Sequence, residues 1–302
     1  MSLNGDAKVF GNYELRTVFS WDGKRLLDFL EHAAASPSLF SVPVAHRKTL
    51  TEIVPILHDF LSSSEERKHS SFVFKSKKPE DLAPVSTFFF GKSFSIYTMF
   101  ELLGVAFSII SNVPVNGSTR ENAFYPLVFL YGHYIQLFQK MIGGSKVPPT
   151  MVSATWSSGY ASYDEDIPTQ ARARPLVMNC TTVESMRKRL IRARYTNMTD
   201  PELGNLSLPE RDVKLTDNLG VTAKTSQAYC AEWLAGMIVN TSPDFKVGPV
   251  HGIAMRVMEI RKIGMFSEYV EDIVAANPCP NCQNMYEICH CHMSNFATGR
   301  RD

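Results

Sequence analysis

Two short cysteine-containing strings near the C-terminal end carry the residue types from which proteins build a catalytic zinc site. The first is Cys230-Ala231-Glu232, and the second is Pro278-Cys279-Pro280-Asn281-Cys282. Three thiolates can hold a zinc ion and leave one position open for water, while a nearby carboxylate moves protons without occupying the metal. We therefore predict that Cys230, Cys279 and Cys282 bind Zn²⁺ and that Glu232 is the catalytic proton carrier.

For these side chains to meet, each string must begin a helix. At a helix start, the Cys230 thiolate can face the metal while Glu232 points at the metal-bound water. Residues 233–278 leave room for the rest of one helix, a strand and a connection into a second helix that begins at Cys279. Helix N-termini also favour thiolate over thiol, because their free amides and their dipole stabilise negative charge.

The two strings together resemble the zinc-dependent cytidine deaminase-like superfamily, in which His or Cys followed by x-Glu precedes Pro-Cys-x-x-Cys. The resemblance covers about residues 150–302 and implies an α/β/α sandwich with a mixed central sheet. It also implies a hydrolytic deaminase of a nucleobase, with a cytosine-type base favoured, either free or in nucleic acid. In that reaction Glu232 would pass a proton from water to the ring and to the departing amine. The backbone at Ala231, Asn277 and Pro278 would contact the base.

The chain departs from the free-nucleoside cytidine deaminases at two points. Trp233 stands where those enzymes usually have Arg after Cys-Ala-Glu, and only residues 283–302 follow Cys282. The compact ending looks more like the YwqJ-type deaminases, a branch associated with toxin modules. Because three thiolates make zinc-bound water less acidic, such sites usually recruit a cation. Arg256 is expected in that role.

A closed structural zinc site is the main alternative. Such a site would use Cys279 and Cys282 together with the residues of the tail, which are Cys289, His290, Cys291 and His292. Cys230-Ala231-Glu232 favours the open site, since a closed one does not need these residues. The four tail residues are expected in surface or packing roles, and a second metal there stays open. A non-catalytic interaction protein with a structural zinc and a degenerate deaminase fold are the corresponding alternative functions.

A cluster of arginines precedes the first string and suggests contact with nucleic acid. Arg187, Arg189 and Arg192 would form a basic helix face that follows phosphates, with Tyr195 able to stack on a base. The alternative is the solvated face of an amphipathic helix. A formal net charge of +1 for the whole chain gives no general argument for a nucleic-acid or membrane partner.

Composition predicts a globular chain without a secretory signal. Its 302 residues include 44% apolar ones, and the N-terminal residues lack both a basic start and an apolar core. The most apolar stretch, 102–110, is about half of what a membrane span needs. We therefore expect an intracellular protein with reduced cysteines and no membrane partner. The sequence does not indicate the oligomeric state.

The chain is expected to contain a helical domain at 1–149 and the deaminase-like α/β domain at 150–302. The glycine- and proline-rich stretch 143–149 marks the boundary. Apolar periodicity predicts helices over 24–35, 50–61, 94–110, 124–142, 182–194 and 265–276, and strands over 151–157, 175–179 and 253–260. A polar loop is expected over 196–222, and His251 is expected in a loop.

Overall fold

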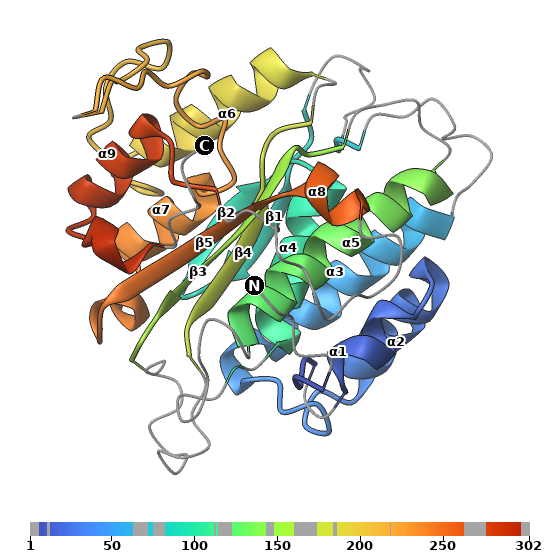
Figure 1. The fold of residues 1–302 in the computed structure, drawn as a ribbon. Coiled ribbons are helices and arrows are strands. Elements are labelled where there is room, and N and C mark those ends of the chain that lie inside the picture. The colour runs from blue at the N-terminus through green and yellow to red at the C-terminus, as the bar shows by residue number, and fades with distance from the viewer. Residues whose placement is uncertain are drawn as a thin grey trace.

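A three-stranded sheet from the second half of the chain lies at the centre of the structure (Figure 1). The computed structural model describes residues 6–10, 13–62, 72–74, 82–111, 113, 123–142, 148–159, 174–183, 186–217, 219–262 and 276–296. Strand β3 (Met151–Ser157) runs between β4 (Leu176–Cys180) and β5 (Val250–Arg256), and both pairings are antiparallel. Among the described residues, parallel pairing enters this sheet only at the bridge between Gly252 and Phe296. The chain is therefore of mixed α and β structure, while the expected mixed sheet rests on that single bridge.

Successive side chains of β3 point to opposite faces of the sheet, and both faces are covered. Trp156 stacks on Phe124 with ring centroids 3.8 Å apart, next to the start of α5 (Tyr125–Met141). The Thr155 hydroxyl oxygen lies 2.8 Å from that of Tyr286 in α9 (Pro280–Ile288). Since alternate residues of a strand share a face, helices from both halves of the chain enclose the sheet.

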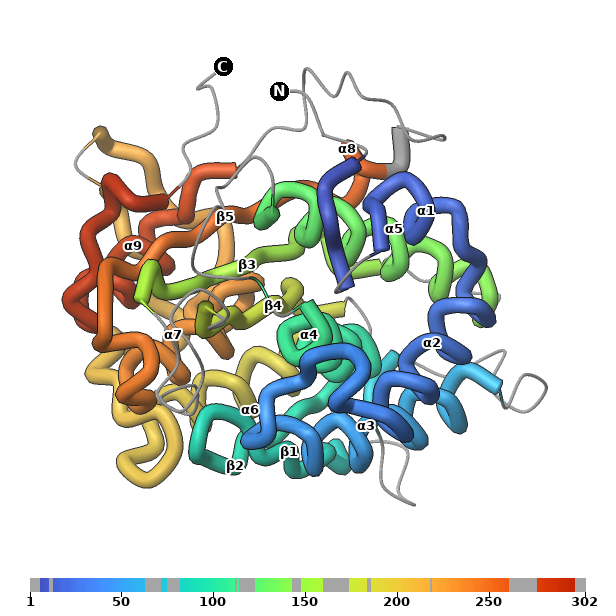
Figure 2. The backbone as a smooth tube through the Cα atoms, turned by 90° about the horizontal axis from the view of Figure 1, so that it is seen from below, coloured from blue at the N-terminus to red at the C-terminus, as the bar shows by residue number. Residues whose placement is uncertain are grey.

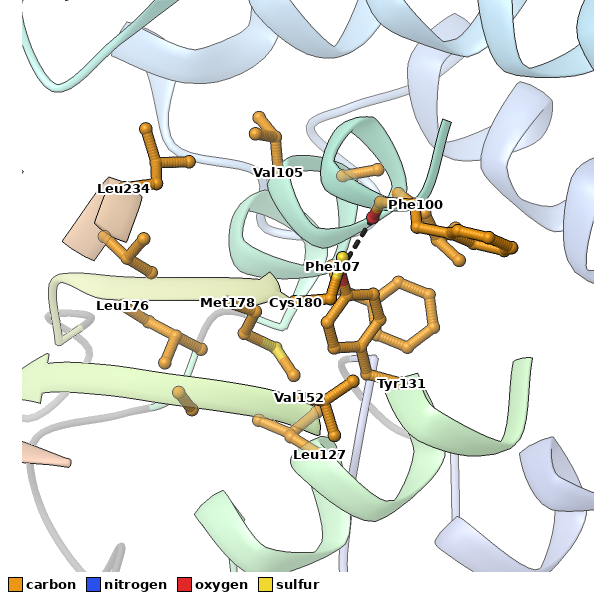
Figure 3. Packing of buried hydrophobic residues seen from close by; sticks show 14 of the residues in the cluster. Phe100, Val105, Phe107, Leu127, Tyr131, Val152, Leu176, Met178, Cys180 and Leu234 are labelled. Carbon is orange, nitrogen blue, oxygen red and sulfur yellow. Dashed lines mark hydrogen bonds between the residues drawn. The ribbon is translucent and has the colours of Figure 1, made fainter. Parts of the chain in front are cut away.

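Helix α4 (Met99–Ile110) lies directly on β4, because Gly104 presents no side chain there. A Cβ at this position would lie 2.5 Å from the carbonyl oxygen of Met178. A capping box between Thr98 and Glu101 begins the helix, each side chain accepting from the other residue's backbone N–H. Figure 3 shows Tyr131 of α5 in the same buried layer, where its hydroxyl donates to the carbonyl of Phe100 at 2.7 Å.

The prediction of a single helix over 94–110 is wrong at its N-terminal end, because residues up to Ile96 form a strand. Strands β1 (Val85–Phe89) and β2 (Lys92–Ile96) form an antiparallel hairpin through Phe90 and Gly91, whose φ angles are 49° and 80°. Two central residues with positive φ are typical of tight hairpin turns. In β2, buried apolar residues alternate with serines, which is the period of a strand and not of a helix.

The remaining helices of the first half pack outside α4 and α5 (Figure 2). They are α1 (Leu15–Phe19), α2 (Gly23–Ala35) and α3 (Val44–Ser62). Helix α2 confirms the prediction for 24–35, whereas α3 begins earlier than expected and contains Pro55. One hydrophobic cluster extends from Val9 to Phe296. The division at residue 149 stays a prediction, and the two parts that it separates share this core.

The helices of the second half differ from the expected ones mainly at their ends. They are α6 (Arg187–Thr199), α7 (Trp233–Thr241), α8 (Val257–Lys262) and α9, with 3-10 turns η4 (Pro243–Lys246) and η5 (Met293–Asn295). Helix α6 does not begin at Thr182, because the backbone N–H of Thr182 donates to the carbonyl of Tyr229. The strand predicted over 253–260 ends at Arg256, and the polar loop begins only at Asp200.

Two predictions fall largely outside the described residues. These are the boundary stretch at 143–149 and the helix at 265–276. Within the part of the chain that the structure describes, no helix has the length and apolar character needed to cross a membrane.

Candidate metal centre

Cys230, Cys279 and Cys282 come together where α7 and α9 begin. The sulfur of Cys279 lies 3.2 Å from that of Cys230 and 3.6 Å from that of Cys282. All three ligand atoms lie within 4.8 Å of one another, and no other such group of His, Cys, Asp or Glu occurs among the described residues. The three cysteines could therefore hold a metal ion, as their spacing in the sequence predicted.

The start of α9 fixes two of the three thiols. Cys279 is the residue that caps the helix, and Pro280 at the first helical position has the backbone angle that a helix start requires. Hydrogen bonds with the Cys230 and Cys282 thiols, followed by those from the backbone N–H groups of Cys282 and Asn281, lower the pKa of Cys279 to about 3. Hydrogen bonding among the three sulfurs, together with burial, raises the pKa values of Cys230 and Cys282.

Glu232 is the residue directly before α7, lies beside the sulfur cluster and is 8% exposed. Its Oε2 atom lies 3.5 Å from the sulfur of Cys282, whose thiol donates to it. Burial, followed by the charge of Cys279, raises the pKa of Glu232 to about 7, and the backbone amides of Glu232 and Ala231 partly oppose this. A buried carboxyl group with this pKa can both accept and release a proton near neutral pH.

A small cavity adjoins Glu232 on the sheet side. Its volume of about 10 Å³ is that of roughly one water molecule. It is lined by Thr155, Glu232, Gly252, Pro278, Tyr286 and Phe296, together with Ile253, Ala254 and Ala276. Of the residues expected to contact the base, Pro278 lines this cavity, Ala231 is buried beside Glu232, and Asn277 is exposed and does not line it.

Asn281, which sequence reasoning did not select, attaches the long loop before α7 to the metal centre. Its Oδ1 accepts from the backbone N–H of Leu215 at 3.1 Å, and its Nδ2 donates to the carbonyl of Thr225 at 2.8 Å. Asn281 is 3% exposed and stands between two cysteines of the cluster. Its position inside Pro-Cys-x-x-Cys was the available signal, since a residue between two candidate ligands at a helix start must lie next to them.

The arginines of the predicted basic face of α6 lie in two different surroundings. Arg187 lies over the ring of Tyr229, 4.5 Å from its centroid. Arg189 and Arg192 are exposed and line an open groove of about 500 Å³ together with Tyr97 and Asn197, among other residues. The predicted stacking residue Tyr195 instead donates its hydroxyl to the carbonyl of Pro209.

Other candidate residues lie apart from the cluster. Arg256 is exposed at the end of β5 and lines neither the cavity nor the sulfur cluster. His251 lies on β5 and not in a loop, and its ring stacks on Trp156, on the opposite face of the sheet from the cavity. The Cys289 thiol donates to the carbonyl of Gly236 and that of Cys291 to the carbonyl of Cys289. Within the described residues, these tail cysteines join no group of metal ligands, and neither do His290 and His292.

No protein-family model matches the chain, and no curated protein or solved structure matches it either.

Proposed function

We propose that the chain is a zinc-dependent hydrolytic deaminase acting on a nucleobase, with a cytosine-type base favoured. This proposal rests on which cysteine joins Cys279 and Cys282 as the third member of the sulfur cluster. Cys230, which is followed by Ala231 and Glu232, meets Cys279 and Cys282, and it does so in place of the tail cysteines. A closed structural zinc site does not need a buried carboxylate beside its ligands, whereas a hydrolytic site requires one to transfer protons.

The donor set fits zinc. Tetrahedral zinc with Zn–S bonds of about 2.3 Å separates its sulfurs by about 3.8 Å. Two of the sulfur separations here are 3.2 Å and 3.6 Å, and all are within 4.8 Å, so a small adjustment suffices. A bound zinc ion would supply a water acidic enough to attack a ring carbon at neutral pH.

Residues of the chain would transfer the proton and contact the base. Glu232, held at the start of α7, would take the proton and return it to the base. Thr155 and Tyr286, whose hydroxyl oxygens are 2.8 Å apart in the cavity wall, would offer polar groups to one edge of the base. Helix α7 and strand β5 follow the first string and α9 begins at the second, which agrees with the arrangement that the resemblance to cytidine deaminase-like proteins implies.

The size of the cavity favours a second candidate, a protein with a structural zinc or a degenerate deaminase. The cavity beside Glu232 has room for about one water, and the ring of Phe296 lies across Gly252 in its wall. A nucleobase could bind only if Phe296 or Pro278 moved. Catalysis by this chain therefore requires opening of the cavity, whereas a structural site does not.

Replacement of Glu232 by Gln separates the two candidates. We expect Glu232→Gln to keep its zinc while the release of ammonia from cytosine nucleosides and single-stranded DNA or RNA falls by about 10²–10⁴-fold. Glu287→Gln, an exposed substitution on α9, is the matched control and should keep full activity. Wild-type protein that binds zinc but releases ammonia from none of these substrates would favour the structural alternative.

We further propose that the substrate is held as nucleic acid by the groove along α6. Arg189 and Arg192 are exposed there and would contact phosphates. Charge reversal of both should weaken binding of a single-stranded oligonucleotide and reduce its dependence on salt. Lys24→Glu with Lys48→Glu changes the net charge equally on α2 and α3 and should leave binding unchanged. Equal effects of the two double variants would contradict this use of the groove.

A further inference from the structure

Arg194 belongs to the arginine cluster of α6, yet its side chain is fully buried. It is 0% exposed, as is Glu101 of α4, with which it forms a two-point ion pair. The Arg194 Nε and Nη2 atoms donate to Oε1 of Glu101 at 2.8 Å and 2.5 Å. The other carboxylate oxygen of Glu101 accepts from the backbone N–H groups of Tyr97 and Thr98. The pair is thus fixed to the start of α4.

The rest of the guanidinium contacts both ends of the segment that carries Cys230 and Glu232. Nη1 donates to the carbonyl of Tyr229 at 3.4 Å, directly before Cys230. The guanidinium carbon lies 5.0 Å from the ring centroid of Trp233, directly after Glu232. Nη2 also donates to the carbonyl of Cys180 at the end of β4, at 3.3 Å. One planar group therefore connects α4, β4 and the two ends of this segment.

The backbone of the same segment needs such support. Ala228, two residues before Cys230, has φ 62°, in the left-handed region that residues with a Cβ avoid. Between Tyr229 and Trp233 the chain is not yet helical, so no repeating helical hydrogen bonds fix it. Contacts from neighbouring elements have to hold Cys230 and Glu232 in place.

We infer that Arg194 is a positioning residue for the metal centre, which holds the Tyr229–Trp233 segment so that the Cys230 sulfur meets those of Cys279 and Cys282. The inference rests on the proposed metal site and makes no use of the substrate. A lysine could replace the charge next to Glu101, but it cannot present a planar fork to Tyr229 and a flat face to Trp233 at the same time.

The test measures zinc affinity of the full-length chain by competition with a chromophoric chelator, and the absorption spectrum of the Co²⁺-loaded protein. Arg194→Lys keeps the buried charge balance, and we expect it to bind zinc about 10–100-fold more weakly with an altered Co²⁺–thiolate spectrum. Lys188→Met, an exposed change on the same helix, should behave as wild type. Circular dichroism and urea denaturation establish that each variant is folded.

A second variant keeps the test decisive if Arg194→Lys fails to fold. Glu101→Gln combined with Arg194→Met removes both charges, which a protein interior often tolerates. The inference predicts weakened zinc binding in this folded double variant as well. Wild-type zinc affinity and an unchanged Co²⁺ spectrum in either folded variant would overturn it and leave the proposed function intact. Absence of zinc binding in the wild-type chain would overturn both.

Discussion

At the scale of single residues, the grouping of the three cysteines was predictable from the sequence, whereas the residues that surround them were not. Cys230, Cys279 and Cys282 lie in two local strings, of which the first directly precedes α7 and the second begins α9. Asn281 and Tyr286 are also at the site, but nothing in their types or spacing identifies their partners. Those partners, Leu215 and Thr155, lie far away in the sequence, so only the folded chain reveals them.

Asn281→Ala should destabilise the protein by about 1–3 kcal/mol, because it leaves the buried N–H of Leu215 and the carbonyl of Thr225 without their partner. Urea denaturation measures the loss. Asn277→Ala, an exposed change just before α9, should cost less than about 0.5 kcal/mol. Hydrogen exchange at the Leu215 amide should accelerate in Asn281→Ala, and wild-type exchange there would show that the loop is held by other contacts.

At the scale of elements, amphipathic helices and buried strands were predicted best. Helix α2 carries one apolar stripe, and β3 coincides with the short strand predicted over 151–157. The prediction failed at the start of α4, because the long apolar run of this buried helix was extended over β2, whose alternation of serines with apolar residues indicates a strand. It failed again at the start of α6, where the backbone N–H of Thr182 donates to the carbonyl of Tyr229 and the helix begins only at Arg187.

His46 joins α3 to the β1–β2 turn and should make the stability depend on pH. It is 3% exposed, and its ring lies 5.0 Å from those of Phe89 and Phe90. Burial lowers the pKa of His46 from 6.5 to about 4, with Asp244 acting in the opposite direction. The unfolded chain therefore binds the proton more readily, and stability is lost as the pH falls from about 6.5 to about 4.

His46→Leu should remove this part of the pH dependence, which is on the order of 3 kcal/mol between those limits. Urea denaturation over this pH range measures the slope, and the slope is independent of any change in stability at neutral pH. Some dependence should remain from His133, since burial lowers its pKa to about 4 as well. A slope identical to that of wild type would mean that His46 is not buried as described.

At the scale of the whole molecule, helices from the first half cover one face of the sheet from the second half. Phe124 stacks on Trp156, and the Gln136 side chain donates to the carbonyl of Val257 at 2.6 Å. The sequence indicated a helical half and an α/β half, but contacts between residues so distant in the chain leave no periodic signal. The shared core was therefore not predictable from local patterns, although the convergence of Cys230, Cys279 and Cys282 was.

Residues 150–302 expressed alone should not unfold cooperatively, because the face of β3 that carries Trp156 would lose its cover from α4 and α5. Urea denaturation and binding of a hydrophobic dye measure this. Co-expression with residues 1–149 should restore a cooperative transition. A single cooperative transition of the isolated fragment, without dye binding, would show instead that the two predicted domains fold independently.

Zinc content measured by native mass spectrometry decides whether Cys230 belongs to the metal centre. We expect one zinc ion per chain in the wild type and in Cys289→Ala, since Cys289 lies in none of the described ligand groups. In Cys230→Ala the zinc should be lost, because two sulfurs remain of the three that converge. A full complement of zinc in Cys230→Ala would contradict the open site and place the metal in a closed structural centre.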